Sequence, residues 1–241
     1  MLGAYHAGAW KALERELAFD IVVGVSVGAL NGWAIAGGAS AQSLIELWLD
    51  ECTAGLLRHR VPALPWRGFF DLRSLELTTQ ELLRRYTPRV DFGVVLVEFP
   101  RLHSRLVRLD EVTWRHLAAS CAVPGGFPPV RVGSRRYVDG GLLCPLPVWA
   151  ALELGATRVV AVNALASPPS RVVRGLALGL RAVVRERYPV SSAVDLLTIA
   201  PTGRLGTLSE AVTWRREVIQ RWIEQGEQDA LRALASRTLV G

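Results

Sequence analysis

A serine stands between two glycines near the start of the chain, in the pattern Gly24-Val-Ser26-Val-Gly28. The β-branched run Ile21–Val23 before it predicts a buried strand, and the proline-free segment Ala29–Ala36 after it predicts a helix. Ser26 would then occupy a sharp strand-to-helix turn, where the hydroxyl is exposed and the helix dipole favours a developing anion. Gly24 and Gly28 let the chain bend and pack closely there. This spacing predicts nucleophilic attack by Ser26, although so short a motif also recurs by chance.

A serine nucleophile needs a base, and the chain holds the four histidines His6, His59, His103 and His116. In the α/β-hydrolase order the histidine comes last, after the serine and the acid, whereas no histidine follows residue 116 here. A triad would need His103 or His116 in an unusual order. Both lie in segments typical of solvated surface histidines, so the order argues against a triad.

A carboxylate can replace histidine when it is shielded and lies within hydrogen-bond reach of the serine hydroxyl. Asp139 is the candidate, because it follows a short strand and precedes Gly140 and Gly141, which allow a tight turn that presents the side chain. A plain Asp-Gly hairpin turn has the same pattern. From these residues alone both interpretations stay open.

Helices and strands alternate along the segments that would position these residues. Expected helices cover residues 4–17, 27–36, 78–86, 111–120 and 145–154, with one more beginning after Ser40, and expected strands cover 20–24, 94–97, 106–109, 135–138, 158–162 and 196–200. The strands at 94–97 and 106–109 are candidates to pair with each other. This alternation predicts an α/β layer fold with a largely parallel sheet.

The composition is that of a globular chain, with 241 residues, 50% of them hydrophobic, which suits one large domain or at most two. The formal net charge of +6 comes from scattered arginines, since Lys11 is the only lysine, so no concentrated basic stripe predicts nucleic-acid binding. Cys52, Cys121 and Cys144 form neither a disulfide framework nor a metal motif. No apolar run is long enough to span a membrane and no signal peptide is recognisable, which predicts a cytoplasmic protein.

Three further stretches are informative, and the first two bear on contact with a membrane. Residues 58–70 combine prolines with aromatic side chains, which fits a substrate-facing or membrane-touching loop but more often reflects local packing. Residues 171–187 place arginines among apolar residues, and a crossover helix with a basic outer face is favoured over a membrane-surface helix. Residues 209–234 form a long amphipathic stretch. Peripheral contact with an anionic membrane is compatible with this basic chain.

The sequence resembles patatin-like phospholipases across nearly its whole length. Four pieces carry the resemblance, in the family's order: Gly3-Ala-Tyr-His-Ala-Gly8, Gly24-Val-Ser26-Val-Gly28, Ala118-Ala-Ser-Cys-Ala-Val-Pro-Gly-Gly-Phe-Pro-Pro129 and Asp139-Gly140-Gly141. The resemblance implies one three-layer α/β/α domain over residues 1–241, with a mostly parallel sheet. It also implies a Ser26–Asp139 dyad without histidine that hydrolyses acyl esters of phospholipids or other lipids. It implies no metal and no organic cofactor.

The chain departs from the family before Gly3, where a strand and a glycine-rich loop normally supply hydrogen-bond donors to the oxyanion. Only Met1 and Leu2 stand there, which leaves Gly3 and the Val27 amide as partial donors. Loss of one donor costs on the order of 3 kcal/mol of transition-state stabilisation, so we expect the chain as given to be weak or inactive. We expect the true start of the protein to lie upstream. The alternative is a non-catalytic patatin-like protein that binds lipid or a partner.

Overall fold

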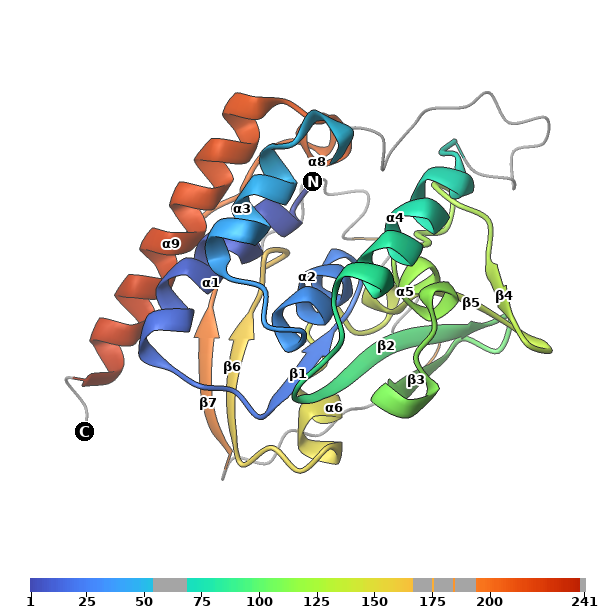
Figure 1. The fold of residues 1–241 in the computed structure, drawn as a ribbon, viewed down its shortest axis with the longest axis horizontal. Helices are drawn as coiled ribbons and strands as arrows, with labels where there is room; N and C mark the ends of the chain where they lie inside the picture. Colours follow the sequence, from blue (N-terminus) through green and yellow to red (C-terminus); the bar gives the residue numbers. More distant parts are fainter. Residues whose placement is uncertain (54–68, 167–174, 176–183, 185–193, 239–241) are drawn as a thin grey trace.

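The computed structural model describes residues 1–53, 69–166, 175, 184 and 194–238 (Figure 1). Within these residues the longer helices are α1 (Gly3–Glu16), α2 (Val27–Ala36), α3 (Ala41–Leu49), α4 (Leu72–Arg85), α5 (Trp114–Ser120), α6 (Val148–Glu153), α8 (Leu208–Val212) and α9 (Arg216–Thr238). The strands are β1 (Ile21–Gly24), β2 (Asp91–Phe99), β3 (His103–Arg108), β4 (Val130–Val132), β5 (Arg135–Asp139), β6 (Arg158–Val162) and β7 (Asp195–Ile199).

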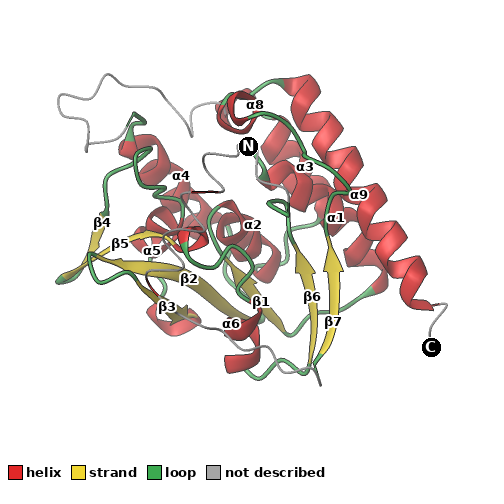
Figure 2. Ribbon diagram, turned by 180° about the vertical axis from the view of Figure 1, so that it is seen from behind, coloured by secondary structure: helices red, strands yellow, loops and turns green. Residues whose placement is uncertain are grey.

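The central sheet is built around β2. β1 pairs parallel with its first half, β5 pairs antiparallel with its second half, and β3 pairs antiparallel with residues 93–98. A strand has two hydrogen-bonding edges, and β3 occupies one of them over both halves. β1 and β5 therefore share the other edge and approach each other end to end along it. β4 extends the sheet beyond β5 (Figure 2).

The α/β class is confirmed, but the central sheet is mixed and not mostly parallel. β1 and β2 are parallel, whereas β3, β4 and β5 run antiparallel to their neighbours. Short connections explain the difference, since the residues between β2 and β3 and between β4 and β5 are too few for the long crossover that a parallel pair requires. The expected pairing of the strands near 94–97 and 106–109 is confirmed as the antiparallel β2–β3 pair.

Helices cover both faces of the central sheet. Every residue of β2 from Phe92 to Glu98 is buried, as expected for a strand with covered faces. On one face, Phe92, Val94 and Leu96 share a core cluster with residues of α2, α4 and α5. On the other face, Val97 packs with residues that follow β5, and α6 contacts β1 and β2. The described residues thus form the expected three layers.

A second, two-stranded parallel sheet, β6–β7, lies under α1 and α9. The two helices approach so closely that a Cβ at Gly8 would lie 1.9 Å from the carbonyl oxygen of Ile223, and one at Gly226 would lie 2.1 Å from that of Tyr5. The amphipathic stretch expected at 209–234 is thus mostly α9, and its buried face, with Ile219 and Trp222, packs inside the protein.

Several expectations concern residues at the edge of the described chain. Of the aromatic stretch 58–70 only Phe69 and Phe70 are described, and Phe70 packs on Phe127 with ring centroids 5.4 Å apart. The segment 171–187 lies outside the described residues except for positions 175 and 184. Among the helices that the structure describes, none has the length and apolar character that crossing a bilayer would need.

Candidate active site

Ser26 adopts a backbone conformation that is rare for a residue with a side chain, with φ 54° and ψ −137°. The Gly28 amide donates to the Val25 carbonyl at 2.9 Å, which closes a turn of type II′ with Ser26 at its first central position. Such a conformation costs of order 1–3 kcal/mol and persists only where the surroundings enforce it. It places Ser26 at the N-terminus of α2, where the helix dipole stabilises negative charge.

The two glycines of the motif differ in whether the surrounding atoms leave room for a side chain. A Cβ at Gly24 would lie 2.4 Å from Ala29 Cα and 2.5 Å from the Gly28 carbonyl oxygen, so only glycine lets β1 meet α2 this closely. A Cβ at Gly28 would find its nearest neighbour, His6 Cε1, at 3.5 Å, which is an ordinary contact. The expectation that both glycines are needed for a close turn therefore holds for Gly24 and is wrong for Gly28.

The end-to-end approach of β1 and β5 brings Ser26 and Asp139 together. Gly24, the last residue of β1, lies opposite Val94, and Asp139, the last residue of β5, lies opposite Leu96, two positions further along β2. Gly140 fits in the small gap between the two ends. A Cβ there would lie 2.3 Å from the Val95 carbonyl oxygen and 2.9 Å from Val25 Cγ2.

Asp139 is buried, with only 4% of its surface exposed. Its Oδ1 accepts a hydrogen bond of 2.7 Å from the Gly141 amide, and the Ser26 side chain lies beside its carboxylate. Burial raises the pKa of Asp139 to about 6, because desolvation of the carboxylate outweighs the influence of these two groups, which lowers the pKa. The group is therefore mostly ionised at neutral pH and can accept a proton from a hydroxyl beside it.

The histidines of the alternative triad lie in other settings. His103 is exposed at the start of β3, as expected. His116 is buried and not solvated, contrary to expectation, because its Nδ1 accepts a hydrogen bond of 3.1 Å from the Thr113 amide and closes the cap of α5. His59 lies outside the described residues. His6 is buried near the serine turn, since its Cε1 would lie 3.5 Å from a Cβ added to Gly28, and burial lowers its pKa to about 4.

Gly3 is tied to the helix that follows Ser26. Its carbonyl accepts a 2.8 Å hydrogen bond from Asn31 Nδ2, and Asn31 Oδ1 accepts one of 3.0 Å from Trp48 Nε1. The Trp48 ring fills the space where a Gly3 side chain would begin, with Cζ2 only 2.1 Å from an ideal Cβ. Gly3 at the start of α1 and Asn31 of α2 are therefore held by one buried network.

The sequence model of the patatin-like phospholipase family matches residues 1–152 of this chain. The chain belongs to the patatin-like phospholipase family. A lysophospholipase NTE1 from Scheffersomyces stipitis is 28% identical over 174 residues, which cover 67% of this chain and 11% of that relative. The uncharacterized protein YqhO of Bacillus subtilis is 27% identical over 177 residues, or 59% of this chain and 60% of that protein. This chain thus spans about a tenth of the length of the lysophospholipase relative.

The fold of this patatin-like chain is similar to a solved structure. The crystal structure of VipD from Legionella pneumophila superposes with a TM-score of 0.53 at 12% sequence identity, covering 98% of this chain and 65% of that one. At this identity the likeness concerns the fold alone. It supports the α/β architecture on which Ser26 and Asp139 are placed.

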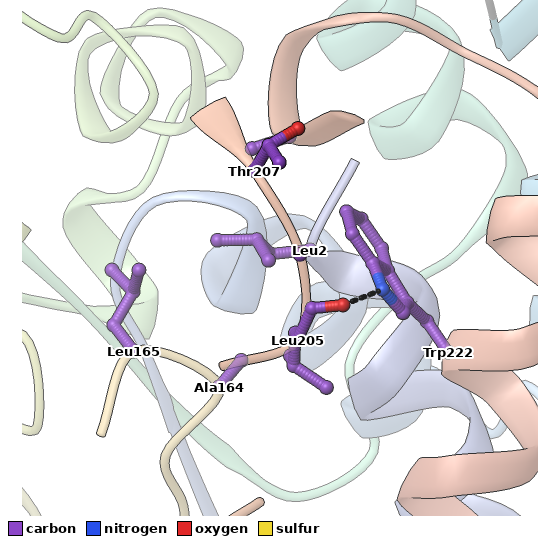
Figure 3. Close-up of a pocket in the computed structure, with 8 residues that line it drawn as sticks. Leu2, Ala164, Leu165, Leu205, Thr207 and Trp222 are labelled. Carbon is purple, nitrogen blue, oxygen red and sulfur yellow. Dashed lines mark hydrogen bonds between the residues drawn. The ribbon is translucent and has the colours of Figure 1, made fainter. Parts of the chain in front are cut away.

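A small cavity lies near the start of α1 (Figure 3). Leu2, Ala164, Leu165 and Leu205 line it, and Trp222 closes one side, with its Nε1 donating to the Leu205 carbonyl at 2.6 Å. Its volume of about 10 Å³ holds one water molecule at most. An acyl chain does not fit there in this conformation.

No group of three or more potential metal-binding side chains occurs among the described residues. The three cysteines form no disulfide; Cys52 is exposed, and Cys121 and Cys144 are buried. Cys121 lies near the candidate base, and burial together with the charge of Asp139 raises its pKa, so it stays a neutral thiol. Ser26 and Asp139 are therefore the candidate reactive groups of the site.

Proposed function

We propose that this chain hydrolyses carboxylic esters of lipids, with Ser26 as nucleophile and Asp139 as base. One observation carries the proposal. A serine in a strained turn at a helix N-terminus lies beside a buried carboxylate whose pKa lies near 6. A base is most effective when its pKa is close to the working pH, and a buried carboxylate approaches that condition.

The reaction begins when Asp139 accepts the hydroxyl proton of Ser26 and Oγ attacks the ester carbonyl carbon, forming a tetrahedral oxyanion. Collapse of this intermediate breaks the bond to the leaving alcohol, and the protonated Asp139 returns the proton to that alkoxide. Ser26 is left acylated. Water then gives a proton to Asp139 and attacks the acyl carbon, which forms a second tetrahedral intermediate. Its collapse breaks the bond to Ser26 Oγ, to which Asp139 returns the proton, and this releases the fatty acid and restores the hydroxyl.

Backbone amides would stabilise the oxyanion in both steps. The Val27 amide belongs to the first turn of α2, whose N–H groups have no partner within the helix. Gly3, held beside α2 through Asn31, is the second candidate. Each such donor typically contributes a hundred- to thousandfold in rate, on the order of 3 kcal/mol.

The substrate class follows from the family and from the named relatives, among which NTE1 is called a lysophospholipase. We therefore propose single-chain phospholipids as the first substrates to try. Such lipids occur in micelles and bilayers, so the enzyme would contact a lipid surface at its periphery. The dyad itself needs no metal and no organic cofactor.

Hydrolysis of lysophosphatidylcholine and of p-nitrophenyl butyrate by the wild type and by Ser26→Ala tests the proposal. The wild type should release fatty acid and p-nitrophenol, and the variant should fall to background. His103→Ala and His116→Ala should both keep most of the activity, because the dyad uses neither ring. Equal rates in wild type and Ser26→Ala would contradict the proposal. An inert wild type that still binds lipid micelles would favour the non-catalytic alternative.

A further inference from the structure

The end of α5 is hydrogen-bonded to both members of the proposed dyad. Ser120, the last residue of α5, accepts a hydrogen bond of 2.7 Å at Oγ from the Ser26 amide. Two residues later, the Ala122 carbonyl accepts one of 3.1 Å from the Asp139 amide. We call residues Ser120–Ala122 the α5 brace. It links two turns that lie more than a hundred residues apart in the chain.

The α5 brace is rigidly placed. The Cys121 and Ala122 amides continue the helical pattern by donating to Ala118 and Ala119 at 3.1 and 3.0 Å. Ser120 and Ala122 are both completely buried. A close-packed setting of this kind has little freedom to adjust, so the distance between the two hydrogen-bonding groups of the brace is fixed.

A serine at position 120 destabilises α5 unless its hydroxyl is hydrogen-bonded. The preceding residues Ala118 and Ala119 are also fully buried, and a hydroxyl in such surroundings costs free energy unless it is hydrogen-bonded. Serine also forms helices less readily than alanine. The Ser26 amide, which is partly buried in a strained turn, gains its partner from this hydroxyl.

We infer that Ser120 is a positioning residue for the reaction of Ser26. It holds the Ser26 backbone in the strained turn through the Ser26 amide, while the Ala122 carbonyl holds the Asp139 backbone at a fixed separation. The inference rests on the proposed function. A misplacement of about 1 Å between nucleophile and base is enough to lower a rate by roughly a hundredfold, which is why such a link matters.

Three substitutions at Ser120 separate hydrogen bonding from packing. Ser120→Ala removes the acceptor, Ser120→Cys keeps the volume but offers only a weak acceptor, and Ser120→Thr keeps the hydroxyl. Thr79→Val is the matched control, because Thr79 is also completely buried and loses one hydroxyl, on α4, away from the dyad. Each variant is assayed for kcat and KM on p-nitrophenyl butyrate. Amide hydrogen exchange is measured at Ser26 and Gly141.

Ser120→Ala and Ser120→Cys should lower kcat about tenfold to a hundredfold with KM changed less than about threefold, and Ser120→Thr should recover most of it. The Ser26 amide should exchange at least about tenfold faster in Ser120→Ala, while the Gly141 amide stays protected. Thr79→Val should leave both readouts unchanged. Unaltered kcat in Ser120→Ala and Ser120→Cys would overturn the inference, as would unaltered exchange at Ser26.

The same experiment distinguishes this inference from the proposed function. If the wild type has no activity that depends on Ser26, the proposed function fails and the catalytic role of the α5 brace fails with it. Exchange at Ser26 still reports whether Ser120 holds the turn. If the wild type is active and all Ser120 variants retain its kcat, only the inference about the α5 brace fails.

Discussion

Burial of Asp139 makes its carboxylate a better base and at the same time makes the ionised form destabilise the fold. Its carboxyl pKa rises from 3.8 to about 6 on folding, so the folded state binds more protons than the unfolded state between these pH values. The contribution of this group to stability therefore falls as pH rises through that window. A pKa difference of about two units corresponds to about 3 kcal/mol in the free energy of unfolding. This free energy is the cost of keeping an ionised base in a buried site.

Asp139→Asn removes this cost and the base together. At about pH 8 the variant should be more stable than the wild type by up to about 3 kcal/mol, and at about pH 4 the gain should vanish because Asp139 is then protonated. Ester hydrolysis should be lost at every pH. Urea unfolding followed by circular dichroism across this range measures the difference. A variant that is less stable than the wild type at the higher pH would contradict the account.

At this scale the sequence identified Ser26 and Asp139 but not what holds them. Ser26 belongs to a local motif, and Asp139 belongs to a piece shared with the family, so both could be named. The hydrogen bond from Ser26 to Ser120 joins residues 94 positions apart, and nothing local encodes it. The sequence did not predict the position of His6 near Gly28 either, because it depends on how α1 packs beside the turn.

Among the elements, the junction of β1 with α2 imposes the strictest geometry. Gly24→Ala would place Cβ against backbone atoms of Gly28 and Ala29, which no rotamer change relieves, and should cost about 3 kcal/mol or more. Gly28→Ala meets only ordinary contact and gains helix propensity, so stability should be unchanged or rise by up to about 1 kcal/mol. Thermal unfolding of the pair checks this. A similar loss in both variants would show that the two glycines are not distinct.

The elements themselves were predicted unevenly. The helix at 27–36 and the strand at 158–162 match α2 and β6, because local composition and a glycine stop define them. The helix expected at 111–120 divides into a 3-10 turn at Leu109–Glu111 and α5, since Thr113 caps a new helix. The sequence did not predict strand β4, which has only three residues. The prediction of a largely parallel sheet was wrong because short hairpin connections, and not the alternation of helices and strands along the chain, determine the strand directions.

For the molecule as a whole, the contact between α1 and α9 decides whether the chain folds as one unit. The family match ends at residue 152, yet α9 packs on α1 near the N-terminus, with backbone against backbone at Gly8 and Gly226. Tyr5 also donates a 2.9 Å hydrogen bond to the buried Asp229 of α9. This interface supports the prediction of a single domain over the whole chain.

Gly226→Ala tests that prediction. The added Cβ would lie 2.1 Å from the Tyr5 carbonyl oxygen and 3.0 Å from the Ala9 amide nitrogen, so the helices must separate, at a cost of about 3 kcal/mol or more. Gln228→Ala on the exposed side of α9 should change stability by less than about 0.5 kcal/mol. If the chain is one domain, far-ultraviolet circular dichroism and tryptophan fluorescence will report one coincident, shifted transition. A separate early transition would contradict it.

The most direct test of the dyad is the rate at which a fluorophosphonate labels Ser26, followed by intact mass as a function of pH. The wild type should gain one adduct at a rate that falls below a pH of about 6, as Asp139 becomes protonated. His6→Gln should keep this limb, because burial leaves His6 neutral down to a pH of about 4. Ser26→Ala should gain no adduct, and Asp139→Asn should react at least about a hundredfold more slowly. Equal labelling of Asp139→Asn and wild type, or an unlabelled wild type, would contradict the Ser26–Asp139 dyad.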